Sequence, residues 1–410
     1  MSKIFVDQVD PRTATTLTLG TTGDTVSIPS GVTIANAGTA TGFGDATNFR
    51  PNVDPLIING DMAVAQRSTS VAGVTGNGYQ TCDRLKLQVS DAGTWTVIQE
   101  ALSSGAAYTD GFSTAFRIDC TAADASVAAA SYLYPKYMIE GQDLQLLKKG
   151  TANAEPVTIS FWVKSNLTGN YQLTIRDQNT RMCAGVYAIS IADTWEKKTI
   201  NIAADTSGVI ANTNGEGLAL EFWLAAGSNY TGGTAPTAWE AKVDTDRAAG
   251  LNVQMSSSTS NDWAITGIQL EVGTYTSATL PPFQHESYGD SLSRCQRYFV
   301  QFGNNQGVAD QGNYGLGITN NDNEGCHVLI PLPTTMRTAS STITQSGTAS
   351  DYAVRTTTTD ASTGVPVFAD ATTSNILVKF VNNGHGFGTG VVVRGMTNAD
   401  PSFIGVSAEL

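Results

Sequence analysis

Short stretches of alternating apolar and polar residues recur along residues 55 to 283, separated by Gly, Asn, Asp and Ser. This alternation is the pattern of strands with one buried face, and the residues between them favour turns. Charged residues form 14% of the chain, against ~25% in typical soluble domains. The Lys, Glu and Arg residues that usually cover the exposed faces of helices are therefore scarce. The sequence therefore predicts an all-β protein with a central jelly-roll β-sandwich. The expected strands are Leu85–Val89, Thr94–Gln99, Ser113–Asp119, Pro156–Lys164, Tyr171–Asp177, Lys197–Ile202, Leu218–Leu224 and Asp262–Val272.

The chain changes character between residues 265 and 302. Its first part, Ile265–Val272, alternates in polarity and is expected to form a half-buried strand that closes the preceding sheet. Two adjacent prolines, Pro281 and Pro282, then prevent strand pairing. Residues after them can form one or two helical turns, with Ser287 or Asp290 as the N-cap. We therefore predict a short linking helix at a boundary between two domains.

The N-terminal 52 residues consist of very short alternating strands separated by Gly and Pro turns. Each strand has too few apolar side chains to offset its ordering entropy in a single copy. One solution is a homotrimeric β stalk that buries these side chains on a shared axis, and the alternative is a free disordered arm. The side chains expected at the axis are Leu17, Leu19, Val26, Ile28, Val32 and Ile34.

Two apolar runs near the C-terminus, Ile376–Val381 and Gly390–Val393, predict strands buried on both faces. The C-terminal part is therefore expected to be a second β-sandwich. The predicted organisation is an N-terminal attachment and stalk segment (1–52), a jelly roll (53–283), a linking helix (284–300) and a C-terminal β tip domain (301–410).

Composition excludes several classes of function. A net charge of −13 argues against binding nucleic acid, because such affinity depends on Lys and Arg neutralising phosphates. The first residues lack the apolar run of a signal peptide, and no stretch approaches the ~20 apolar residues of a membrane span. Synthesis in a cytoplasm without membrane insertion is expected. The five cysteines fit no metal-ligand spacing and are expected to be buried free thiols.

No catalytic motif is present, since the sequence has no G-x-S-x-G, H-E-x-x-H or P-loop pattern. The three histidines, His285, His327 and His385, lie in different contexts and form no local triad or metal cluster. We therefore expect a protein that is not an enzyme.

Sugar binding normally uses an aromatic ring flanked by polar groups. Trp239, near a Gly-Gly turn, and Tyr230 are candidates for an exposed platform, although loop aromatics also anchor loops. A Gly-rich segment near the C-terminus contains His385 and Phe387, and such a distal loop often carries recognition.

Several segments resemble bacteriophage proteins. The run Gln269-Leu270-Glu271-Val272-Gly273, a following Pro-Phe-Gln-His-Glu-Ser-Tyr-Gly segment and Cys295-Gln296-Arg297-Tyr298 resemble a module of phage tail fibres, with Gln284 where an acidic residue is expected. Leu56–Asp61, Val157–Lys164 and Thr194–Ile200 resemble the carbohydrate-binding-module-like domains of such fibres. The resemblance implies a jelly roll with no cofactor except a structural Ca²⁺ held by Asp61 and Glu271. The alternative is that Asp61 caps a turn and Glu271 faces solvent.

The resemblance implies a virion protein of the tail-fibre class that attaches the particle to a host surface by multivalent binding of a surface glycan. Its partners would be two further copies of itself, other virion proteins through the N-terminus, and a host glycan or protein. The alternatives are a purely structural virion component, such as a head fibre or tail adaptor, and a polysaccharide depolymerase. A depolymerase of this kind would be indicated by a long parallel β-helix repeat, and the sequence shows no such repeat.

Overall fold

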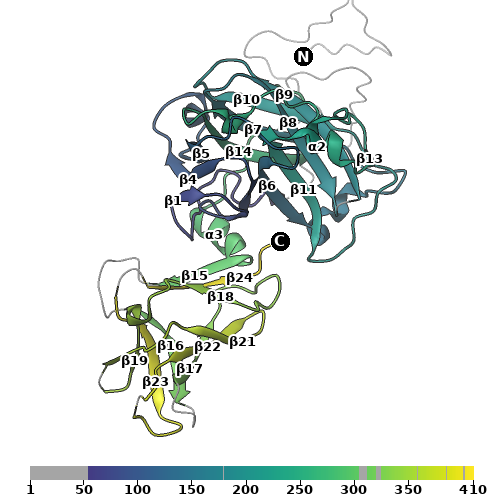
Figure 1. Ribbon diagram of the computed structural model, residues 1–410. Helices are drawn as coiled ribbons and strands as arrows, with labels where there is room; N and C mark the ends of the chain where they lie inside the picture. The colour runs from purple at the N-terminus through teal and green to yellow at the C-terminus, as the bar shows by residue number, and fades with distance from the viewer. Residues whose placement is uncertain are drawn as a thin grey trace, which may run out of the picture. The chain divides into compact units, whose positions relative to one another are not determined.

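The structure is a computed structural model that describes residues 54–178, 180–303, 312–319, 325–357, 359–384, 386–399 and 402–410 (Figure 1). All of these belong to one compact unit, Asn48–Leu410. The predicted stalk, with Leu17, Leu19, Val26, Ile28, Val32 and Ile34, and the candidate binding residue His385 lie outside the described residues.

Two antiparallel sheets form the first sandwich. Sheet A has the order β1 (Ser70–Val74), β4 (Thr94–Ala101), β5 (Thr114–Ala122), β14 (Asp262–Val272), β7 (Val157–Ser165), β10 (Glu196–Ile202). Sheet B has the order β13 (Glu240–Ala241), β9 (Arg181–Ile189), β8 (Gly169–Asp177), β11 (Glu216–Trp223), β6 (Tyr132–Glu140), β3 (Leu85–Ser90), β2 (Gly78–Tyr79), with β12 (Ala225–Ala226) paired to β6.

This arrangement confirms the predicted all-β jelly-roll fold. Each of the eight expected strands forms, within a few residues of its predicted bounds. Two long strands of sheet B, β6 and β9, are additional. The sequence of β6 has Pro135 on its inward face and two tyrosines, Tyr132 and Tyr134, on its outward face. These residues obscured the alternation of apolar and polar side chains.

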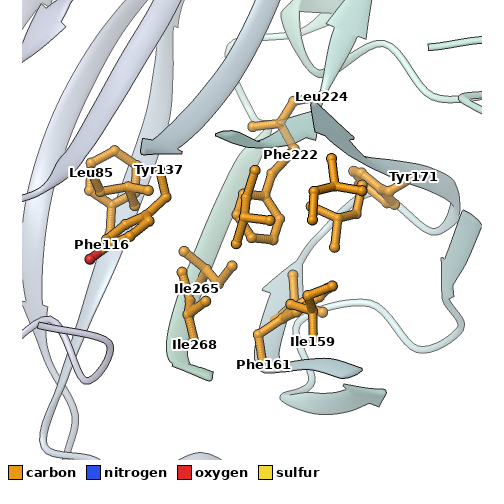
Figure 2. Close-up of a cluster of buried hydrophobic side chains, with 14 of the residues drawn as sticks. Leu85, Phe116, Tyr137, Ile159, Phe161, Tyr171, Phe222, Leu224, Ile265 and Ile268 are labelled. Atoms are coloured by element: carbon orange, nitrogen blue, oxygen red, sulfur yellow. The ribbon is translucent and has the colours of Figure 1, made fainter. Parts of the chain in front are cut away.

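The core between the sheets is built from the inward side chains of each strand (Figure 2). Phe161 of β7 meets Phe222 of β11 edge to face, with ring centroids 5.3 Å apart, and meets Tyr187 of β9 at 5.1 Å. Ile159 and Tyr171 are also fully buried. Burying one such side chain contributes about 1.5–3 kcal/mol, so contacts of this kind hold the two sheets together.

Strand β14 lies in the middle of sheet A, between β5 and β7, and corrects the expectation of a half-buried closing strand. Its pairing with β7 shifts between Thr266 and Gln269, and Gly267 has a φ of +62° there. This bulge reverses the alternation, so that Ile265 and Ile268 both face the core. A Cβ on Gly267 would also lie 2.6 Å from Phe112 Cζ. The polar side chains of Thr266, Gln269 and Glu271 are buried as well.

The linking helix is confirmed as α3 (Tyr288–Gln296). Ser287 is its N-cap, because the Ser287 hydroxyl accepts a hydrogen bond from the backbone N–H of Asp290. Asp290 lies in the first turn, where a carboxylate interacts favourably with the helix dipole. The other α-helices are single turns, α1 (Ala106–Thr109) and α2 (Ser228–Thr231). Short 3-10 helices cover Gly141–Leu147, Asp244–Asp246, Met255–Ser257 and Ala349–Asp351. Among the described residues, no helix has the length and hydropathy of a membrane span.

A second sandwich follows α3. Sheet C has the order β15 (Phe299–Gly303), β24 (Phe403–Ser407), β18 (Ile343–Gln345). Sheet D has the order β20 (Thr359–Ala361), β19 (Tyr352–Arg355), β23 (Val392–Thr397), β16 (Asn313–Thr319), β17 (Gly325–Pro331), β22 (Asn375–Val381), β21 (Val367–Ala371). Ile404 and Val406 of sheet C share a core with Val328 and Phe380 of sheet D. The expectation that β23 is buried on both faces is wrong, since Val392 is 65% exposed.

The last residues of the chain return to the jelly roll. The Glu409 carboxylate accepts hydrogen bonds from Arg84, which is 1% exposed, and from Arg67. Arg84 also donates to the carbonyl of Met138 and lies 3.4 Å from the ring centroid of Tyr298. Burial by itself would lower the pKa of Arg84, but the Glu409 charge raises it above its usual range. The C-terminus is thus fixed by a buried ion pair. All five cysteines are free and buried, as predicted.

Replacing Glu409 by Gln should leave the buried Arg84 guanidinium without a compensating charge. Removing one partner of a buried pair is costly, so we expect the free energy of unfolding to fall by about 3 kcal/mol. Denaturant unfolding at pH 7 measures it. The control is Glu155→Gln, at a pair with Lys148 whose side chains are 52% and 36% exposed, and it should change stability by less than about 0.5 kcal/mol. Equal effects of the two variants would contradict this role of Glu409.

Candidate functional site

The outer face of sheet B carries an aromatic cluster that includes the sequence-predicted Tyr230. Tyr134 of β6 and Trp223 of β11 lie on the face opposite the core, with ring centroids 4.3 Å apart. Tyr230, from α2, lies 5.3 Å from Trp223 and 5.9 Å from Tyr132. The structure therefore places Tyr230 at the edge of a group of four rings.

These rings are already occupied by a cation of the chain itself. The Arg247 guanidinium lies 5.0 Å from the ring centroid of Trp223, 5.5 Å from Tyr230 and 5.6 Å from Tyr134. Trp223 is fully buried beneath it. Because a sugar would need an open aromatic face, this cluster serves to hold the segment of residues 227–251 on sheet B. It is a closed site.

A buried carboxylate fixes Arg247 in place. Glu221 Oε1 accepts from Arg176 Nε at 2.6 Å and from Arg247 Nη2 at 2.9 Å. Tyr134 Oη accepts from the same Arg247 Nη2 at 3.1 Å. Burial would raise the pKa of Glu221, but the two guanidinium groups hold it below its usual range. Glu221 is therefore ionised inside the protein, and the charges of Arg176 and Arg247 compensate its own.

Two other aromatic candidates lie in separate places. Trp239 donates its Nε1–H to the carbonyl of Ala203 at 2.8 Å, and the Lys149 ammonium lies 4.2 Å from its ring centroid. The Trp239 side chain is partly buried and packs against the jelly-roll core. Phe387 is partly buried against the core of the second sandwich. Trp239, Tyr230 and Phe387 thus belong to three different clusters.

The two residues expected to hold Ca²⁺ have different surroundings. Asp61 Oδ1 accepts from the N–H of Ala63 at 3.4 Å, within its own turn. Glu271 is 3% exposed and accepts from Gln269 Nε2 at 3.3 Å, so it does not face solvent. Within the described ranges, no group of three or more His, Cys, Asp and Glu side chains is placed to hold a metal ion.

An open pocket of 390 Å³ lies where sheet C meets the β1–β2 side of the jelly roll. We call it the junction pocket. Sheet C supplies one of its walls, because Val300, Ile404 and Val406 face the second core and the alternate residues face the pocket. The pocket is lined by Arg67, Ser68, Val71, Tyr79, Gln80, Phe299, Gln301, Thr344, Phe403 and Ser407.

A glycine keeps the sheet C wall of the junction pocket open. Gly405 pairs with Gln301 on one side and with Thr344 on the other. A Cβ at Gly405 would lie 2.3 Å from Thr344 Oγ1 and 3.0 Å from Phe299 Cζ. Any larger residue would therefore displace side chains that line the pocket.

The side chains in the junction pocket combine apolar rings with available polar groups. Arg67 is fixed, because its guanidinium lies 3.5 Å from the Phe299 ring centroid and donates to Glu409 at 3.2 Å. By contrast, four polar side chains make no hydrogen bond to any residue that the structure describes. These are the amides of Gln80 and Gln301 and the hydroxyls of Thr344 and Ser407. They can donate to and accept from a ligand.

Two further hollows differ in chemistry. One of 540 Å³ is lined by Arg294 and Arg297, but Arg294 donates to Glu286 at 2.6 Å and Arg297 to Glu140 at 2.8 Å. Its two arginines are therefore already paired with carboxylates. The other, of 790 Å³, lies on sheet D and is lined mainly by aliphatic side chains.

Sequence reasoning did not find the junction pocket. Its walls come from residues 67–80, 299–301, 344 and 403–407, and the residues share no motif. Gln301 and Phe299 directly follow the Cys-Gln-Arg-Tyr run, which was the only local signal near the site.

No protein-family model matches the sequence, and the comparison with curated proteins gave no match. Among solved structures, the chain is similar to the enzymatically active domain of tailspike protein 4 of bacteriophage CBA120, with 10% identity, a TM-score of 0.27 and coverage of 53% of this chain but only 21% of that one. A putative sugar-binding protein from Bacteroides thetaiotaomicron has 11% identity and a TM-score of 0.28, covering 53% of this chain and all of that one. A family 11 carbohydrate-binding module from Clostridium thermocellum has 11% identity and a TM-score of 0.24, covering 50% and 98%. TM-scores at this level establish neither fold nor activity for this chain.

Replacing Glu221 by Gln should strongly destabilise the jelly roll at neutral pH, because it removes the fully buried carboxylate that pairs with both Arg176 and Arg247. We expect a loss of about 3–5 kcal/mol in the free energy of unfolding at pH 7. A carboxylate whose pKa is lowered by folding contributes stability above its unfolded pKa, and this is lost as the pH falls through the folded value. The difference between variant and wild type should therefore shrink in acid.

Denaturant unfolding at pH 7 and at pH 3 measures both effects. Asp244→Asn is a matched control, since Asp244 also contacts Arg247, at 3.3 Å, but is 56% exposed. It should alter stability by less than about 1 kcal/mol. A Glu221→Gln variant as stable as wild type at pH 7 would contradict the assigned role.

Proposed function

We propose that this chain is a fibre-type virion protein that binds a host-surface glycan in the junction pocket. The observation that carries the proposal is the set of four unpaired polar side chains beside half-buried rings. Sugars present hydroxyl groups around an apolar ring face, and sites for them pair aromatic side chains with amides and hydroxyls. Gln80, Gln301 and Phe403 supply this combination. The pocket volume of 390 Å³ suits one or two sugar units.

Charge favours an uncharged glycan as the ligand. The one cationic side chain that lines the pocket, Arg67, is paired with Glu409 and Asp83. The residues that line the pocket include no carboxylate that could bind a cationic ligand or repel an anionic one. Because the chain as a whole carries a charge of −13, a polyanionic ligand would also meet long-range repulsion.

The assignment to a virion fibre is supported by the resemblance of residues 265–302 to a tail-fibre module. Residues of that segment have structural roles here: Cys295, in the last turn of α3, is fully buried, and Arg297 and Tyr298 both donate to Glu140. We propose that residues 1–52 join three copies and attach them to the particle. Three weak sites on one fibre would then act together through avidity. The proposed action is binding without cleavage of the glycan.

Glycan binding can be tested with the full-length protein on an array of bacterial surface polysaccharide fragments, followed by titration of the best ligand. Phe403→Ala and Gln301→Ala should each weaken binding at least tenfold, because each removes one element of the pocket. Tyr132→Ala and Gln88→Ala, on the outer face of sheet B, should leave the affinity unchanged. Mass spectrometry of the ligand after incubation should show it intact.

The binding proposal would be overturned if no fragment binds, or if the pocket variants bind as tightly as wild type. The appearance of shorter fragments would show that the protein cleaves the glycan, and would overturn the proposal of binding without cleavage. Thermal unfolding of each variant shows whether the fold is retained.

A further inference from the structure

The outer face of sheet D is apolar on four adjacent strands. Leu316 and Ile318 of β16 are 63% and 54% exposed, Leu329 of β17 is 50% exposed and Val392 of β23 is 65% exposed. Leu377 of β22 lies beside them. A sheet with one solvated face normally alternates apolar inward with polar outward residues. Here five outward positions, Leu316, Ile318, Leu329, Leu377 and Val392, are aliphatic and line a hollow of 790 Å³. Such a patch on a protein surface marks an interaction site.

Strand register arranges these side chains in rows across the sheet. One row runs from Arg394 through Leu316, Leu329 and Leu377 to Asp370, because each residue is paired directly with the next. Directly paired residues point to the same face of a sheet. The row therefore has a basic end and an acidic end, with three leucines between them.

Arg355 of β19 pairs with Arg394, which places a second basic residue at that end. The adjacent row contains Val392, Ile318, His327, Lys379 and Val367. Its basic residue Lys379 lies on the acidic side, but both of its ends are aliphatic. Of these two rows, only the leucine row has opposite charges at its ends.

We propose that this face, which we call the leucine face, docks on the leucine face of a second copy of this chain. The occupant follows from the charges. Arg394 and Asp370 lie four strands apart, about 19 Å, and cannot pair within one chain. A two-fold axis along β17 would place Leu329 over Leu329 and the Arg394 end of each copy over the Asp370 end of the other.

This surface is distinct from the junction pocket and from residues 1–52. Its self-association does not require that the protein bind a glycan or that the N-terminal segment form a stalk. It would add a contact between copies in the C-terminal sandwich and cover the leucine row, which a single chain leaves in water.

Cysteine cross-linking in the full-length protein tests the contact. The double variant Arg394→Cys with Asp370→Cys should be linked between copies by a short bis-maleimide reagent, because two packed sheets lie about 10 Å apart, beyond the ~7 Å that a disulfide spans. Within one chain the two positions are about 19 Å apart, too far for the same reagent. The five native cysteines are buried and free, so they do not compete. A denaturing gel should show linked dimers.

Controls separate a specific contact from chance collision and from tethering elsewhere in the chain. Each single cysteine variant should remain largely unlinked, since neither residue meets itself across the two-fold axis. Ile191→Cys with Val209→Cys, at 61% and 70% exposed positions of the jelly roll, gives the rate of random linking. Adding Leu316→Asp to the Arg394→Cys, Asp370→Cys variant should reduce linking at least tenfold, whereas adding Val209→Asp should not.

A band pattern no stronger than that of the Ile191→Cys, Val209→Cys control would overturn the proposal. So would linking that survives Leu316→Asp, because it would show proximity without burial of the leucine face. Leu316 is exposed in the single chain, so the substitution should leave the thermal unfolding temperature close to that of wild type.

Discussion

The Arg84–Glu409 ion pair is the contact on which the rest of the described structure depends. Arg84 directly precedes β3 with a φ of +73° and is buried against Tyr298 and Tyr137. A buried guanidinium is tolerated only when its charge and its donors are satisfied. The partners come from the other end of the chain, because Glu409 supplies the carboxylate. Arg337 then donates to the carbonyls of Ala408 and Glu409 and fixes the tail. The first and last described segments are thus joined at one point.

Fixing the tail also forms the junction pocket. Glu409 orients Arg67, which covers Phe299, and Tyr79 donates its hydroxyl to the carbonyl of Leu410. The C-terminus therefore helps to hold the pocket wall from sheet C against the wall from the jelly roll. By contrast, the aromatic cluster on sheet B is complete within the jelly roll and is filled by Arg247. Aromatic content alone did not distinguish an open site from a closed one.

Both sandwiches use glycine where a side chain would collide with its neighbours. Gly267 creates the bulge that lets Ile265 and Ile268 face the same core, and Gly405 keeps Thr344 and Phe299 apart. The local sequence pattern does not show which glycines have this role. Ile265–Val272 resembled a simple alternating strand, yet it is a central strand with both faces covered.

The sequence by itself determined eight strands of the jelly roll, the choice of Ser287 or Asp290 as the α3 N-cap, the free cysteines and the all-β class, because each follows from short-range periodicity, turn chemistry or composition. It also singled out Tyr230 as an aromatic of interest. Only the tertiary structure decided that Arg247 closes the Tyr230 cluster, that Trp239 anchors a loop, and that Gln301 and Phe403 share a pocket. It also decided that the apolar runs of sheet D leave one face in solvent. The physical reason is that burial and pairing depend on contacts between residues far apart in the chain, and strand periodicity does not specify which face of a sheet another element covers.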